Sequence, residues 1–278
     1  MQLIEKFTKG KHNNNDSEDR LFFSKDFVAV VDGVSSKCSF RLDGKSTGQI
    51  AADLVCQALE TLRPEADLHE ILTATQERFG TFYRACDFPY DRRNYGPQAV
   101  MAIYSRRRRE LHLIGDTQCL VDGVHHCRPK PSDLLFAQLR CMVLEIFAEE
   151  KQLSGSADLS PAERQAARAY IEDWIVRATC FANRSKSSYG YAVVDGQTVP
   201  EELVLSLPLD AGAHEVVLAT DGYPRLFSSL EASELALARL LEEDPHCCAN
   251  NPQTKGLQPG CYSFDDRSYI RLAIPALD

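Results

Sequence analysis

The sequence contains no apolar run of about 18 residues, the length that a membrane-spanning helix requires. Its amino-terminal segment, MQLIEKFTKGKHNNNDSEDR, also lacks an apolar stretch that could act as a signal peptide. We therefore expect a cytoplasmic protein that has no membrane partner.

Paired cysteines at metal-binding or redox spacing are missing as well. The chain has 10 cysteines scattered over 278 residues, and no CxxC pair occurs among them. This distribution indicates reduced thiols. The segment His125–Cys127 has no second ligand cluster at a fixed spacing, so we interpret it as a loop and not as a metal site.

An excess of positive charge is also absent. The 31 basic and 40 acidic residues give a net charge of -9, which argues against a nucleic-acid partner. The four arginines at 106–109 lie between two predicted strands, and we interpret them as a solvated turn. Clustered acidic side chains in a cleft would instead attract cations.

Apolar patterning predicts blocks of strands at both ends of the chain and helices between them. The expected strands cover residues 21–23, 27–31, 99–104, 110–114, 118–121, 189–194, 203–207, 215–220 and 268–274. The expected helices cover residues 48–62, 68–85, 131–151, 161–177 and 230–242. Because strands and helices do not alternate regularly, the pattern favours an α+β layered fold over a doubly wound one.

We expect one domain over residues 1–278, with a helical hairpin inserted at residues 131–177. Ser160, Pro161 and Glu163 have the spacing of a capping box with proline at the first helical position, and they predict where the second helix of the hairpin begins. Shaping of substrate access and simple packing are both open as roles for this hairpin.

Carboxylates stand beside the ends of several predicted strands: Glu18, Asp19, Asp32, Asp116, Asp221, Asp265 and Asp266. If these strands are neighbours, the acids converge at one edge, and their mutual repulsion would raise some of their pKa values. A hard divalent cation with oxygen ligands removes that repulsion. Gly33 and Gly222 follow two of the acids, and their bare backbone could approach an ion. The set predicts two cations about 4 Å apart, the separation that suits two-metal hydrolysis.

In their order along the chain, these motifs resemble the metal-dependent Ser/Thr phosphatase family, protein phosphatase 2C or PPM, in a divergent, bacterial-type form. The segments SEDRLFF and FVAVVDGVSS are similar to its Asn-Glu-Asp and Asp-Gly-x-Gly-Gly motifs, and KSTGQIAADLV resembles the helix that follows. LHLIGDTQCLV, VVLATDGYPRLF and FDDRSYIRLAI resemble its Gly-Asp-Ser, Thr-Asp-Gly and closing Asp-Asn/Asp strands.

The resemblance implies a four-layer α-β-β-α sandwich, in which helices flank two antiparallel sheets. It also implies two Mn²⁺ or Mg²⁺ ions, with Asp32 bridging both and the Gly33 carbonyl contacting one. Asp221 and Asp265 would hold the first ion and Glu18 the second, with Asp19 adjoining them. The implied reaction is hydrolysis of phosphoserine or phosphothreonine in a phosphoprotein, and the product of a cognate Ser/Thr kinase is a candidate substrate. A metal-bridging water would attack phosphorus, so Asp32 and Asp221 would act through that water.

The chain departs from the family pattern where phosphate is bound. Asn14 stands where the family often has a phosphate-gripping arginine, and Lys11 and His12 are candidates to replace it. Ser35 and Ser36 stand where glycines are usual.

Two further departures lie later in the chain. Asp116 matches one ligand of a third metal found in bacterial members, but Arg225 occupies the position of the other ligand. Asp116 is thus a candidate third-metal ligand, and Arg225 is a candidate phosphate contact or partner of Asp116. The family's Leu-Thr-x-Asp-His segment is absent, and residues 131–177 stand in its place.

Two other interpretations remain open. Residues 43–47, DGKST, end like a phosphate-binding loop, although Ser39 stands where that pattern requires glycine and no strand leads directly into the segment. Loss of ATP binding on changing Lys45 would support this interpretation. The other keeps the fold but assigns a catalytically weak module that binds phosphoproteins or regulates a partner. The missing arginine favours that module, and the intact set of carboxylates opposes it.

Overall fold

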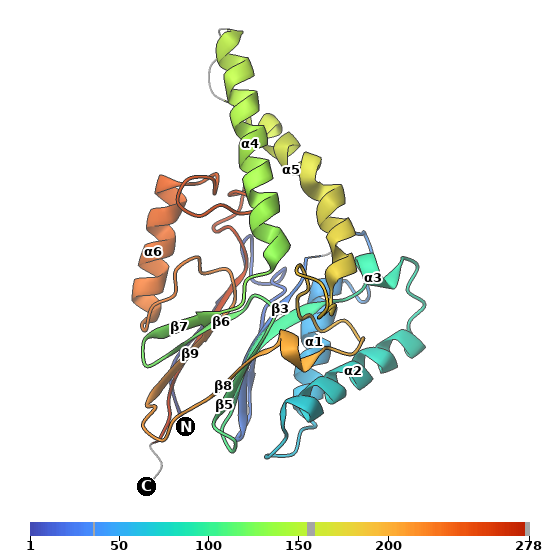
Figure 1. Ribbon diagram of the computed structural model, residues 1–278, viewed down its shortest axis with the longest axis vertical. Helices are drawn as coiled ribbons and strands as arrows, with labels where there is room; N and C mark the ends of the chain where they lie inside the picture. The colour runs from blue at the N-terminus through green and yellow to red at the C-terminus, as the bar shows by residue number, and fades with distance from the viewer. Residues whose placement is uncertain (36, 155–158, 276–278) are drawn as a thin grey trace.

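Two antiparallel sheets form the centre of the computed structural model, which describes residues 1–35, 37–154 and 159–275 (Figure 1). The first sheet has the order β1 (Gln2–Lys9), β10 (Arg267–Ala273), β9 (Glu215–Ala219), β6 (Gln118–Val121) and β7 (Val124–Cys127). The second has the order β2 (Arg20–Phe23), β3 (Phe27–Gly33), β4 (Ala99–Ser105), β5 (Glu110–Ile114) and β8 (Leu205–Pro208). The two strands that lead into an Asp-Gly pair, β3 and β9, therefore belong to different sheets.

The β3 strand is buried on both faces, which explains its uninterrupted apolar sequence. Val28 and Val30 share an apolar cluster with Leu218 of the opposite sheet. Ala29 points the other way and shares a second cluster with Ile50. Because successive side chains of a strand face opposite sides, β3 joins the core between the sheets to the core beneath the helices.

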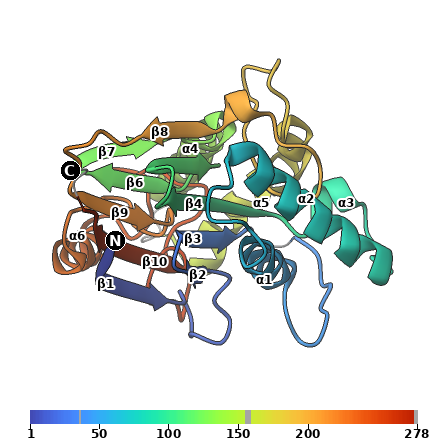
Figure 2. The ribbon, with the colours of Figure 1, turned by 90° about the horizontal axis from the view of Figure 1, so that it is seen from below.

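Helices cover the outer face of each sheet (Figures 1 and 2). α1 (Thr47–Leu59) and α2 (Leu68–Ala85) bury their apolar faces against the second sheet. α6 (Leu230–Glu243) lies against the first sheet, where Leu230 packs on the cluster that contains Val217 and Tyr269. The arrangement is the four-layer α-β-β-α sandwich that the family resemblance implied.

Two long helices project beyond the ends of the sheets (Figure 1). α4 (Pro131–Leu153) and α5 (Pro161–Arg177) pack on each other, and we call this pair the arm. Ser160 and Glu163 form the predicted capping box at the start of α5. The remaining helices are short: α3 (Arg92–Tyr95) and the 3₁₀ helices Ala178–Phe181 and Glu201–Leu203. None of the helices in the described ranges is long and apolar enough to span a membrane.

The strand predictions were wrong in three places. β1 and β7 are edge strands with mostly exposed side chains, so the apolar pattern does not reveal them. His125–Cys127, interpreted as a loop, lies in β7 and pairs with β6. Residues 189–194 form no strand, because 191–194 are buried but pair only in isolated bridges at Tyr191 and Val194.

The arginine run forms the turn between β4 and β5, as predicted, but its last member is not solvated. The Arg109 side chain is buried and donates hydrogen bonds to the carbonyl oxygens of Pro275 at 2.6 Å and Asp210 at 2.8 Å. Arg106 pairs with Asp26 at 2.8 Å. These contacts give two of the arginines a structural role within the sandwich.

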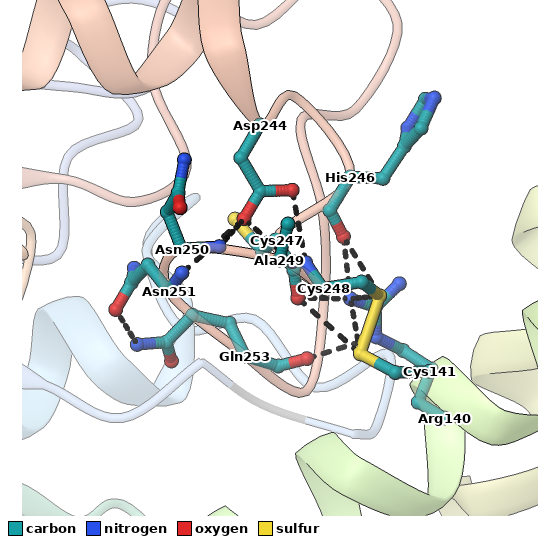
Figure 3. The surroundings of a disulfide bond; sticks show 10 residues. All are labelled: Arg140, Cys141, Asp244, His246, Cys247, Cys248, Ala249, Asn250, Asn251 and Gln253. Carbon is teal, nitrogen blue, oxygen red and sulfur yellow. Dashed lines mark hydrogen bonds between the residues drawn. A yellow bond between two sulfur atoms is a disulfide. The ribbon is translucent and has the colours of Figure 1, made fainter.

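A disulfide bond links the arm to the loop after α6, residues 244–256, as Figure 3 shows. It joins Cys141 of α4 to Cys248. The neighbouring Arg140 is buried and donates to the carbonyl oxygens of His246 at 2.6 Å and Gln253 at 2.8 Å. The prediction of reduced thiols is wrong for these two cysteines. Their separation of 107 residues gave the local sequence no pairing signal.

Candidate functional site

A cavity of about 360 Å³ lies between the ends of the sheets and the arm, and four of the predicted carboxylates line it: Asp32, Asp116, Asp221 and Asp265. β3 and β5 both run antiparallel to β4, so the carboxyl ends of β3 and β5 lie at the same edge. β9 runs antiparallel to β10, which puts the end of β9 beside the start of β10. Strand direction therefore brings together four acids that are far apart in the sequence.

Three of these acids lack a cationic partner in the part of the chain that the structure describes. Asp32, Asp116 and Asp221 form no ion pair with any basic side chain in the described parts of the chain. Burial raises the pKa of each, and the negative charges of neighbouring carboxylates raise it further. Asp221 is open to the cavity, yet the surrounding protein still makes its ionised form unfavourable. The electrostatics of this group favour the binding of a cation.

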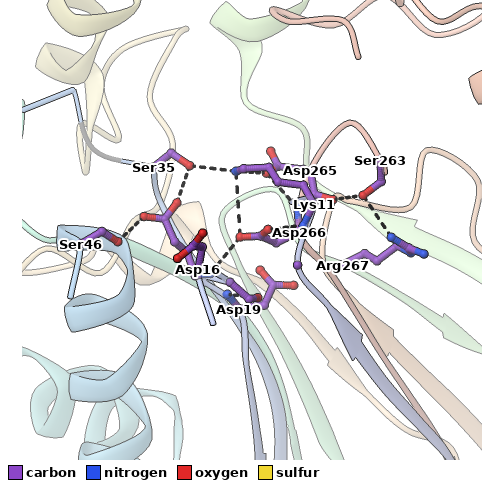
Figure 4. Close-up of polar contacts among 12 residues, drawn as sticks. Lys11, Asp16, Asp19, Ser35, Ser46, Ser263, Asp265, Asp266 and Arg267 are labelled. Carbon is purple, nitrogen blue, oxygen red and sulfur yellow. Dashed lines mark hydrogen bonds and ion pairs between the residues drawn. The ribbon is translucent and has the colours of Figure 1, made fainter. Parts of the chain in front are cut away.

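Asp265 differs from the other three because two lysines already neutralise it. Lys11 Nζ lies 2.7 Å from Asp265 Oδ1, and Lys255 pairs with Asp265 Oδ2 (Figure 4 shows the Lys11 contact). Burial acts to raise the pKa of Asp265, but the two lysines outweigh it and hold that pKa well below its usual range. A cation at Asp265 would have to displace or share these contacts.

Glu18 does not line the cavity. Its carboxylate accepts hydrogen bonds from the hydroxyl groups of Ser35 and Ser46. It lies beside the first turn of α1, where Gly33 and Gly48 come into close contact. A Cβ on Gly33 would lie 2.1 Å from the carbonyl oxygen of Gly48. Glycine is thus required at position 33 for the packing of β3 against α1, a reason that the sequence did not reveal.

Asp19 is buried behind the cavity. Its Oδ2 accepts a hydrogen bond from the Thr220 hydroxyl at 2.9 Å, whereas its Oδ1 has no partner in the described chain. Burial raises the pKa of Asp19 to about 7. The adjacent Asp266 accepts from the backbone N–H groups of Lys11 and Glu18, both at 2.8 Å, and so fixes the segment that carries these residues.

The three residues predicted to contact phosphate, Lys11, His12 and Arg225, do not line the cavity. Lys11 is bound to Asp265, His12 is exposed, and Arg225 is exposed and does not line the cavity. Arg225 forms no ion pair with Asp116 in the described structure. Ser36 falls outside the described residues.

Basic residues that the sequence did not single out also line the cavity: Lys37, Arg128, Lys130, Arg168 and Lys255. No motif surrounds any of them. They come from the loop after β3, the arm and its approach, and the 244–256 loop, so only the folded chain brings them together.

The segment that ends like a phosphate-binding loop lies elsewhere. Lys45 is exposed and pairs with Asp53 at 2.7 Å. Ser46 is the N-cap of α1, and its hydroxyl accepts from the Gln49 N–H. Lys45 therefore has a surface partner, and Ser46 caps α1 and donates to Glu18, so neither residue faces the cavity.

The donor set suits a hard divalent cation by its chemistry. Within the described residues it offers three carboxylates that form no ion pair and the unpartnered Oδ1 of Asp19, and oxygen donors of this kind are preferred by Mg²⁺ and Mn²⁺. In the ranges that the structure describes, no three His, Cys, Asp or Glu side chains are gathered closely enough to hold one ion. The carboxylates line a shared space, and ion binding would require them to draw closer.

No protein-family model and no curated protein sequence matches this chain. Solved structures to which it is similar include the serine/threonine phosphatase PstP/Ppp of Mycobacterium tuberculosis, at 15% identity and a TM-score of 0.49, covering 99% of this chain and 100% of that chain. The PPM Ser-Thr phosphatase MsPP of Mycobacterium smegmatis is 12% identical with a TM-score of 0.47, covering 99% and 100%. The serine/threonine phosphatase Stp1 of Staphylococcus aureus is 13% identical with a TM-score of 0.46, covering 100% and 96%.

Proposed function

We propose that this chain is a metal-dependent phosphatase that hydrolyses phosphoserine or phosphothreonine in proteins. The observation that carries the proposal is the group Asp32, Asp116 and Asp221, which comes from both sheets and lines one cavity without a cationic partner in the described chain. Such a group costs stability when its members are ionised. Binding of divalent cations would offset that cost, and the bound ions could then assist hydrolysis of a phosphate ester.

In this proposal the chain would hold two Mn²⁺ or Mg²⁺ ions. Asp32, Asp221, Asp265 and Glu18 would supply carboxylate ligands, and Gly33 would supply its carbonyl oxygen. Asp19 would adjoin these ligands, and Asp116 is a candidate ligand for a third ion. When bound, the ions would lower the pKa of a water molecule and offset negative charge on the phosphoryl oxygens.

The residues around these ligands hold them in place. The hydroxyl groups of Ser35 and Ser46 orient Glu18, and the hydroxyl of Thr220 orients Asp19. Lys11 keeps Asp265 ionised at its position beside the cavity. Outer contacts of this kind fix the direction and basicity of metal ligands. They give Glu18 and Asp19 defined positions although neither lines the cavity itself.

The test is hydrolysis of p-nitrophenyl phosphate and of a phosphothreonine peptide with Mn²⁺ or Mg²⁺, and again with EDTA. We expect metal-dependent hydrolysis by the wild type and none by Asp32→Asn. Asp43→Asn is the matched control, because Asp43 is exposed outside the cavity and asparagine tolerates its positive φ of 50°. Calorimetric titration with Mn²⁺ reports metal binding separately from turnover.

The same experiment separates the catalytic proposal from the binding module. A wild type that binds Mn²⁺ and the phosphopeptide but hydrolyses neither substrate would support the module. If Asp221→Ala retained full metal-dependent activity, the assignment of metal ligands would fail even though hydrolysis was real.

A further inference from the structure

The cavity is also lined by a group of basic side chains. Lys37 lies in the loop after β3, Arg168 in α5, and Lys255 in the 244–256 loop, and all three line the cavity. None of them matches a motif that the sequence offers for phosphate binding. We call the carboxylates at the strand ends the acidic side of the cavity, and we call Lys37, Arg168 and Lys255 the basic side. The two sides meet where Lys255 pairs with Asp265, and Asp133 of α4 also lines the cavity.

Lys37 and Arg168 have no carboxylate partner among the described residues. Lys37 Nζ donates to the Ser35 carbonyl oxygen at 3.3 Å, and an Arg168 guanidinium N–H donates to the Thr254 carbonyl oxygen at 2.7 Å. Within the described ranges neither side chain forms an ion pair, although the exposed Glu172 is near enough to influence both charges.

The basic residues also repel one another. Lys37 is exposed to solvent on its own surface, yet desolvation by the surrounding protein lowers its pKa to about 8, and the positive charges of Arg168 and Lys255 lower it further. Burial likewise lowers the pKa of Arg168. Repulsion among like charges is relieved when an ion of opposite charge binds between them. The carboxylates of the cavity thus favour the binding of a cation, and its basic residues favour the binding of an anion.

We propose that Lys37, Arg168 and Lys255 bind the phosphoryl group of a phosphomonoester, and that they replace the arginine that is absent at Asn14. The choice of a monoester rests on the proposed function, whereas the anion site itself rests on the basic residues alone. Hydrogen bonds from guanidinium and ammonium groups to phosphate oxygens are charge-assisted and directional.

The contacts of Arg168 and Lys255 explain how this side is held. The Thr254 carbonyl oxygen fixes one part of the Arg168 guanidinium, so the arm is attached to the loop that carries Lys255. Lys255 in turn contacts Asp265 and borders the acidic side. The arm therefore contributes a substrate-binding residue, which gives the inserted helices a function beyond packing.

The test measures binding of inorganic phosphate by calorimetry in the presence of Mg²⁺, together with KM and kcat for p-nitrophenyl phosphate. We expect Arg168→Gln and Lys37→Gln each to weaken phosphate binding roughly tenfold or more, and to raise KM more than they lower kcat. Arg168→Lys should retain part of the affinity. Arg164→Gln is the matched control, because Arg164 lies one turn earlier in α5 and contacts His246 outside this cavity.

The outcomes separate this inference from the proposed function. If the wild type binds phosphate through Arg168 and Lys37 but hydrolyses nothing, the anion site stands and the phosphatase proposal fails. If hydrolysis occurs but both variants bind phosphate within about twofold of the wild type, well below the change expected for a lost charge-assisted contact, the anion site is refuted. Absence of any phosphate binding by the wild type would also refute it. Thermal unfolding of each variant establishes that a lost affinity does not come from lost folding.

Discussion

The acidic and basic sides of the cavity are built from different kinds of structure. The acidic side consists of residues at the ends of β3, β5, β9 and β10, which the ladders of two sheets hold in place. The basic side comes from the arm and from loops, and side-chain contacts and one disulfide hold it. A rigid scaffold thus positions the groups for cations, and a more adjustable one positions the groups for the phosphorylated substrate.

The largest effect should come from removing a carboxylate from the acidic side. We expect Asp32→Ala to lower metal-dependent hydrolysis by more than about 100-fold, since loss of outer-shell contacts alone typically costs 10- to 100-fold in metal sites. Steady-state kinetics at saturating Mn²⁺ and calorimetric titration with Mn²⁺ measure the two consequences. Retention of both Mn²⁺ affinity and activity would show that the acidic side is not the metal site.

A second prediction concerns the disulfide that holds the basic side. Reduction, or Cys248→Ser, should destabilise the protein by about 2–5 kcal/mol, because the bond closes a long loop in the unfolded chain. It should also weaken phosphate binding more than Mn²⁺ binding, since the linked loop carries Thr254 and Lys255. Denaturant unfolding and calorimetry measure these effects, with the exposed free Cys180 changed to serine as control. An equal loss of phosphate affinity and Mn²⁺ affinity would show that the disulfide does not hold the basic residues independently of the carboxylates.

A third prediction uses the pH dependence of the acidic side in metal-free protein. The pKa of Asp19 is raised from 3.8 to about 7, so the folded state binds this proton more tightly than the unfolded state. Stability should therefore rise as the pH falls from 7 toward 4 and should decline as the pH rises through the same window. The raised pKa values of Asp32 and Asp221 act in the same direction.

Thermal unfolding in EDTA across this window measures the rise, with Asp32→Asn as the comparison. We expect a smaller pH dependence in that variant, because one repelling charge has been removed. Comparison with the wild type cancels contributions from groups such as His112, whose pKa burial lowers and which therefore acts in the opposite direction. An identical slope in both proteins would show that repulsion at Asp32 does not affect stability.

The two sides also differ in how far the sequence could predict them. Asp32 and Asp221 follow apolar runs, and such runs report the ends of buried strands, so the acidic side and an α+β layered fold could be predicted from patterning. The four-layer arrangement came from the resemblance of the motifs to a known family. Lys37 and Arg168 have no local signature, because their meeting depends on where the arm and the 244–256 loop pack. The sequence also did not predict the disulfide, because its two cysteines are far apart along the chain. It did not predict the edge strands β1 and β7, because their mostly exposed side chains give no apolar pattern.

The smallest effect should come from Lys45, the basic residue of the segment that resembles a phosphate-binding loop. It is exposed and pairs with Asp53 at the surface, and such pairs contribute about 0–1 kcal/mol to stability. We expect Lys45→Gln to leave phosphate affinity, KM and nucleotide binding within about twofold of the wild type, in contrast to the roughly tenfold loss from Lys37→Gln. Equilibrium titrations with phosphate and with ATP make the comparison. Loss of ATP binding in Lys45→Gln alone would move the anion site away from the cavity and restore the nucleotide-binding interpretation.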